Sequence, residues 1–155
     1  MDREEYLSVL EKAAYQVSLQ KLELTGSYDA AIFPEALVQV GVSHTLQEFY
    51  PLLQYQMEYS VEAIEKSLSG GQKGLTDRTG GRTDIYIQSL GFPFSIIEVK
   101  DEVNGTNDGL IKDSIRVQQL LAIKHNKFNK KLMKHGVLIF YVGKHSENFI
   151  GGRPF

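Results

Sequence analysis

Phe94-Ser-Ile-Ile-Glu-Val-Lys100 is a strongly apolar segment that carries two charged side chains near its end. The apolar run predicts a buried β-strand. Side chains alternate between the two faces of a strand, so Glu98 and Lys100 point to one side while Ile97 and Val99 point into apolar packing on the other. Charged groups are rarely buried unless they are paired or bound to a metal ion. The segment therefore predicts a polar site on one face of a buried strand.

The preceding segment predicts a second strand over residues 82–89. Ile85 and Ile87 would face one side of that strand, and Asp84 would face the other. Gly91-Phe92-Pro93 is typical of a turn, so the two strands form a hairpin or lie next to each other in one sheet.

Pairing of these strands would bring the carboxylates of Asp84 and Glu98 close together. Two ionised carboxylates in contact repel each other. A bound divalent cation would remove that repulsion and would use their oxygens as ligands. An all-oxygen set of donors favours hard cations over zinc.

The flanking segments predict helices around these strands. Apolar residues recur at three- and four-residue steps over residues 4–24, and Pro34 suits the first turn of a second helix that reaches Phe49. Residues 55–64 alternate as a half-buried strand does, although a helix through Ile64 and Leu68 also fits. The remaining predictions are loops over residues 69–81 and 103–109, a helix over 110–128, a strand over 136–142 and a flexible C-terminal tail. This order predicts an α/β fold in a single domain over residues 1–155, with a mixed sheet covered by helices.

Composition places the chain among ordinary globular domains. It has 155 residues, of which 42% are hydrophobic and 23% charged, a size typical of one domain. No run reaches the roughly 18 apolar residues that a membrane helix needs, and the acidic N-terminus is unlike a secretory signal. The absence of cysteine excludes disulfides and thiolate zinc sites and fits a reducing compartment. We therefore expect a cytoplasmic protein with no membrane partner.

Charge is distributed unevenly along the chain, although the net charge is only −2. Residues 1–65 carry most of the acidic side chains. From residue 112 to residue 144 the only acidic residue is Asp113, and the basic residues are Lys112, Arg116, Lys124, Lys127, Lys130, Lys131, Lys134 and Lys144. This half of the chain predicts either a solvated helix surface or a positive face for phosphates.

The stretch Gly80-Gly81-Arg82-Thr83-Asp84, followed after a spacer by Glu98-Val99-Lys100, resembles the motif of the PD-(D/E)xK nuclease superfamily. Thr83 stands where the literal motif has proline. The order of elements over residues 33–142 also matches. The resemblance implies a restriction-endonuclease-like fold, in which a mixed central sheet is flanked by helices.

The same resemblance implies a metal site. Asp84, Glu98 and the backbone carbonyl of Val99 would hold Mg²⁺ or Mn²⁺, which would polarise the scissile phosphate and lower the pKa of a bound water. Lys100 would orient or deprotonate that water and would offset negative charge on the phosphate.

Helices on either side would complete the site. The superfamily often supplies a glutamate from the helix before the sheet, for which Glu35 is the first candidate and Glu48 the second; compensation of the helix dipole is the alternative role of Glu35. The helix after the lysine strand offers Gln118, with Gln119 as a further choice, although both could simply face solvent. The basic candidates for contact with substrate phosphates are Arg82, Arg116 and Lys124.

The glycine-rich stretch over residues 70–74 lacks the spacing of a nucleotide-binding phosphate loop. As a loop beside Asp84, this region could instead contact substrate through Lys73, Arg78 and Arg82.

These features together predict a Mg²⁺-dependent endonuclease that hydrolyses phosphodiester bonds, with DNA as the expected substrate. A cutter of this size would be expected to act as a homodimer in order to reach both strands. The first alternative is a catalytically inactive domain of the same fold that binds protein or nucleic acid. The second is a structural α/β domain, in which Asp84, Glu98 and Lys100 are only an ion-pair network at the end of a strand.

Overall fold

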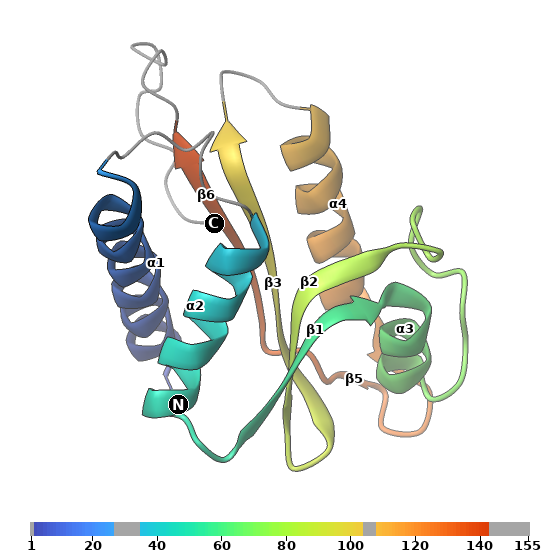
Figure 1. Ribbon diagram of the computed structural model, residues 1–155. Coiled ribbons are helices and arrows are strands. Elements are labelled where there is room, and N and C mark those ends of the chain that lie inside the picture. Colours follow the sequence, from blue (N-terminus) through green and yellow to red (C-terminus); the bar gives the residue numbers. More distant parts are fainter. Residues whose placement is uncertain (1, 27–34, 104–107, 143–155) are drawn as a thin grey trace.

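The computed structural model describes residues 2–26, 35–103 and 108–142 (Figure 1). Its helices are α1 (Arg3–Thr25), α2 (Glu35–Phe49), α3 (Val61–Ser69) and α4 (Asp108–Ala122). Its strands are β1 (Leu53–Ser60), β2 (Arg82–Ser89), β3 (Phe92–Val103), β4 (Lys124–His125), β5 (Lys130–Lys131) and β6 (His135–Val142). The predicted C-terminal tail lies outside the described residues, as does most of the loop predicted over 103–109.

The centre of the fold is a four-stranded sheet in the order β1-β2-β3-β6. β1, β2 and β3 are antiparallel neighbours, and β6 runs parallel to β3. The direct pairing of Ile85 with Ile97 sets the register between β2 and β3. The expected mixed sheet with flanking helices is therefore confirmed, and the finer restriction-endonuclease-like assignment stays a prediction.

Helices cover both faces of this sheet (Figure 1). On one face, α1 and α2 pack against a cluster that includes Ile97 and Val99 of β3. On the other face, α3 and α4 pack against a cluster that includes Ile96 of the same strand. Residues 95–99 of β3 are thus buried on both faces, as their apolar sequence predicts. None of the helices in the described part of the chain combines the length and apolar character that a membrane crossing requires.

The strand predicted over residues 55–64 ends at Ser60, where α3 begins. The Ser60 side chain caps this helix by accepting a hydrogen bond from the Ala63 N–H at 3.4 Å. The strand's alternation also breaks at Glu58, whose φ of 53° lies in the left-handed region. As a result Tyr55 packs with the α1–α2 side, whereas Tyr59 stacks on a tyrosine of the opposite cluster.

The helix predicted over residues 110–128 ends earlier, at Ala122. The next residues form the small ribbon β4–β5, which is anchored to α3 because the Asn126 N–H donates to the Ser69 carbonyl at 2.9 Å. The turn predicted at residues 91–93 lies at Leu90-Gly91, where both φ angles are positive, and β3 already begins at Phe92.

Helices α1 and α2 approach closely where Gly41 faces Val17. A Cβ atom on Gly41 would lie 2.5 Å from the Val17 Cγ2 atom. We expect Gly41→Ala to lower the free energy of unfolding by about 1–3 kcal/mol because of this clash. In a Val17→Ala background the same change should be neutral or stabilising, since alanine favours a helix over glycine by about 1 kcal/mol. Urea unfolding of the four proteins measures this coupling, and an equal cost in both backgrounds would contradict the packing.

Candidate active site

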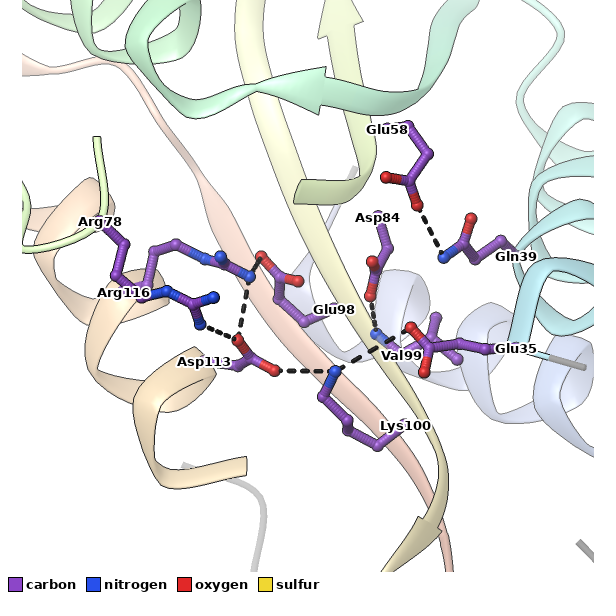
Figure 2. A network of polar contacts seen from close by, with 10 residues as sticks. All are labelled: Glu35, Gln39, Glu58, Arg78, Asp84, Glu98, Val99, Lys100, Asp113 and Arg116. Carbon is purple, nitrogen blue, oxygen red and sulfur yellow. Dashed lines mark hydrogen bonds and ion pairs between the residues drawn. The ribbon is translucent and has the colours of Figure 1, made fainter. Parts of the chain in front are cut away.

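Asp84 and Glu98 lie at the same end of two adjacent strands. Their neighbours Ile85 and Ile97 are directly paired in the β2–β3 ladder. The Val99 N–H donates a hydrogen bond to the Asp84 Oδ2 atom at 2.5 Å, which ties β2 to β3 at this point (Figure 2). The structure therefore brings together the strand residues that the sequence pattern singled out.

The carboxylate of Glu98 is deeply buried and pairs with one cation. Only 1% of Glu98 is exposed, and its Oε1 atom lies 2.7 Å from Arg116 Nη2. Arg116, on α4, is 4% exposed and also contacts Asp113 Oδ1 at 3.0 Å. Arg116 was expected to contact substrate, but its guanidinium faces inward and is engaged by these two carboxylates.

Asp113 forms ion pairs with three basic side chains around the site (Figure 2). Besides Arg116, Arg78 approaches its Oδ1 atom at 3.2 Å. Lys100 Nζ lies 3.1 Å from Asp113 Oδ2 and 3.9 Å from Glu35 Oε1. Lys100 is thereby held between α4 and the first turn of α2, which supports a site role for Glu35 beyond dipole compensation.

Burial dominates the electrostatics of the two strand carboxylates. It raises the pKa of Glu98 to about 7, even though the Arg116 guanidinium acts to lower it and the charge of Asp84 adds to the rise. Burial also raises the pKa of Asp84, against the hydrogen bond from Val99. Burial therefore disfavours the ionised forms of both carboxylates.

Glu65 on α3 shows that burial alone does not produce this effect. Its side chain is 0% exposed, yet it accepts hydrogen bonds from Gly74 N–H, from Thr76 N–H and Oγ1, and from Thr79 Oγ1 at 2.6–3.0 Å. Burial alone would raise the pKa of Glu65, but these four donors outweigh it and lower the pKa below the usual value. Glu65 is a satisfied buried carboxylate, and Glu98 is not.

Several candidates from the sequence lie away from this cluster. Gln118 is exposed, because the buried face of α4 is formed by residues 113, 116, 117 and 120. Glu48 is exposed and lies beside His44 at 3.7 Å. Arg82 and Lys124 are also exposed, at the start of β2 and beyond the end of α4. The cation that pairs with Glu98 is Arg116.

The sequence pattern missed Asp113 and Glu58. Asp113 could have been found as the only acid in a basic stretch, three residues before Arg116 and so on the same face of a helix. Glu58 accepts a hydrogen bond from Gln39 Nε2 at 3.3 Å, and its charge adds to the rise in the pKa of Asp84. No local signal marks Glu58, because its position depends on the irregular backbone of β1.

A pocket of about 420 Å³ borders the ionic cluster on the α4 side. Gln119 lies in its wall and exchanges hydrogen bonds with Asp77, at 3.1 Å to the backbone N–H and 2.8 Å to the carboxylate. The residues that line the pocket are Asp77, Arg78, Lys112, Ile115, Arg116 and Gln119. Cationic side chains therefore face an open space beside the buried carboxylates.

Within the described ranges, no group of three or more His, Asp or Glu side chains is arranged to hold a metal ion. The expected ligands Asp84 and Glu98 contribute only two side chains, and the third, the Val99 carbonyl, belongs to the backbone. Comparison of the chain with protein-family models, curated proteins and solved structures finds no match.

The raised pKa of Glu98 predicts an unusual pH dependence of stability. A carboxyl group whose pKa is about 7 when folded and near 4.3 when unfolded costs stability as pH rises between these values. In EDTA, the free energy of unfolding of the wild type relative to Glu98→Gln should fall by about 2–3 kcal/mol from pH 5 to pH 8. Urea unfolding at each pH measures this difference.

Glu65→Gln is the matched control for this experiment. Because the folded-state pKa of Glu65 is lowered, its stabilising contribution is present above its unfolded pKa and is lost as pH falls through the folded value. The wild type should therefore lose its advantage over Glu65→Gln at acidic pH. The same pH trend in both variants would contradict the contrast between the two buried glutamates.

Proposed function

We propose that this chain is a Mg²⁺-dependent nuclease that hydrolyses phosphodiester bonds in DNA. The observation that carries the proposal is geometric: Asp84 and Glu98 lie on adjacent paired strands, Glu98 is only 1% exposed, and Lys100 follows two residues later on the same strand. Burial raises the pKa of both carboxylates, which is consistent with this arrangement. A divalent cation between the two carboxylates would stabilise their ionised forms.

The residues present fit such an ion by their chemistry. Asp84 and Glu98 offer carboxylate oxygens from adjacent strands, and the carbonyl of Val99 is the third expected ligand. The hydrogen bond from Val99 N–H to Asp84 couples two of these three residues. Oxygen donors favour hard cations such as Mg²⁺ and Mn²⁺. When bound, the ion would supply Lewis-acid polarisation of the phosphodiester.

Lys100 is suited to act as a fixed positive charge. Burial alone would lower its pKa, but the hydrogen bond and the charge of Asp113 raise the pKa of Lys100 above its usual value. A lysine that stays protonated at neutral pH stabilises negative charge on a phosphate and orients a water better than it removes a proton. Asp113 and Glu35 are then positioning residues that hold the ammonium in place.

One observation favours the alternative, a catalytically inactive domain of this type that binds protein or nucleic acid. The Arg116 guanidinium already forms an ion pair with Glu98 and a second one with Asp113. An internal guanidinium in this position would serve as the permanent counter-charge of a domain that uses no metal. The two functions therefore differ in whether a divalent ion binds at all.

Mg²⁺ should stabilise the wild-type protein against heat. At a concentration about 100 times the dissociation constant, binding contributes about 2.7 kcal/mol, which is roughly 5–10 °C in melting temperature for a chain of this size. Asp84→Asn and Glu98→Gln should abolish the shift because each removes a charged ligand. Differential scanning calorimetry with Mg²⁺ and with EDTA measures it.

Glu48→Gln, which removes an exposed carboxylate of α2 outside the site, should keep the full Mg²⁺ response. A wild type that shows no shift with Mg²⁺ or Mn²⁺ and cleaves no nucleic acid would favour the binding domain instead.

Lys100→Ala should reduce the rate of DNA cleavage by about 100-fold or more, because it removes the charge that faces the developing negative charge on phosphate. The fold should survive, since Arg78 and Arg116 remain on Asp113. Plasmid relaxation in Mg²⁺ measures the rate. Lys12→Ala, which removes a lysine of α1 near Phe49, should cleave like the wild type, and undiminished cleavage by Lys100→Ala would contradict its role.

A further inference from the structure

A cluster of exposed lysines lies on residues 124–134, which we call the lysine ribbon. It comprises β4, the following turn, β5 and the residues up to Lys134, and it contains no acidic residue. Its five lysines are all exposed, and none of them forms an ion pair with any residue that the structure describes. These residues are Lys124, Lys127, Lys130, Lys131 and Lys134.

Other exposed lysines of the same region behave differently. Lys66 on α3 lies 2.6 Å from Glu62 Oε1, and Lys73 lies 3.8 Å from the same atom. Glu62 therefore offsets part of the charge of these two lysines. The lysine ribbon instead concentrates unbalanced positive charge on a protein whose net charge is −2. Such a local excess attracts a polyanion.

The ribbon is held in place by contacts to α3 and within itself. The Asn126 N–H donates to the Ser69 carbonyl at 2.9 Å, and the His125 ring packs so closely on Gly70 that an added Cβ would meet it at 3.1 Å. His125 also stacks on Phe128 with ring centroids 4.5 Å apart. A positive surface that is already ordered loses little entropy when it binds.

Phe128 indicates which part of a nucleic acid the ribbon would contact. His125 stacks on its ring, and the Nζ atoms of Lys127 and Lys130 lie 5.9 and 5.8 Å from the ring centroid. His125 therefore already occupies this ring, although 46% of Phe128 is exposed, so the ring is less available to an unpaired base than a free aromatic side chain. Met133 is buried and Leu132 half-buried, so Phe128 is the one exposed large apolar side chain of the ribbon, which is too little for insertion into a membrane.

We propose that the lysine ribbon binds the sugar–phosphate backbone of duplex DNA, outside the candidate active site. The choice of DNA rests on the proposed function. The ribbon follows the end of α4, beside α3 (Figure 1), whereas Asp113 and Arg116 of the same helix reach the buried carboxylates. α4 therefore connects the surface that would bind the DNA backbone to the site that would cleave it.

The test compares two double variants that remove the same charge. Lys127→Gln/Lys130→Gln changes the ribbon, and Lys66→Gln/Lys73→Gln changes two lysines outside the ribbon that both pair with Glu62. Fluorescence anisotropy in EDTA, with a labelled duplex of about 20 base pairs and about 50–200 mM NaCl, gives the affinity and its salt dependence. The ribbon variant should weaken binding by roughly tenfold and reduce the slope of log affinity against log salt by about two. The control variant should bind like the wild type.

Equal weakening in both variants would overturn the proposal, since it would reflect net charge alone. A wild type that binds single strands, phosphatidylserine vesicles or polyglutamate more tightly than the duplex would also overturn it. The absence of metal separates this result from the nuclease proposal: a protein that binds duplex through the ribbon but never cleaves it would refute only the nuclease function. Circular dichroism should show an unchanged fold for both variants, because all four lysines are exposed.

Discussion

Burial of Glu98 on a strand covered from both sides is the constraint around which the charges of this protein are arranged. β3 packs against α1 and α2 on one face and against α3 and α4 on the other, so the Glu98 side chain is shielded from water. A carboxylate in that position requires a counter-charge from the protein or from a ligand. Arg116 supplies one such counter-charge to Glu98. Burial and the nearby charge of Asp84 nevertheless keep the pKa of Glu98 raised.

The two buried glutamates show how local donors decide the state of a carboxylate. Glu65 is surrounded by N–H and O–H donors of the loop that follows α3, and it fixes that loop against the helix. The same loop carries Arg78 to Asp113. Glu65 thus organises one wall of the site through hydrogen bonds, whereas Glu98 presents its charge to a cation. The first arrangement is typical of a structural carboxylate, and the second is typical of a functional one.

The elements that could be predicted from the sequence are those with strong local signals. β3 and β6 contain apolar runs, and β2 alternates apolar and polar residues. α1 ends at Gly26, which adopts the left-handed conformation expected of a helix cap. The start of α3 was harder to predict, because residues before and after Ser60 alternate loosely. The end of α4 was also misplaced: residues after Ala122 pair as a ribbon and dock on α3, an interaction between segments distant in sequence.

The site residues, like the helices and strands, fall into those set by a local pattern and those set by packing between distant segments. Strand alternation was enough to predict that Glu98 and Lys100 point to one side of β3, and that Asp84 points away from Ile85 and Ile87 on β2. The side-chain period of a strand is a local property, so it can be read from a short segment. Which residues of α4 meet them depended on the rotation of that helix against the sheet, which turns Asp113 and Arg116 inward and leaves Gln118 in solvent. The sequence of α4 alone shows that Asp113 and Arg116 share a face of the helix. Packing of whole elements determines that this face turns toward the sheet.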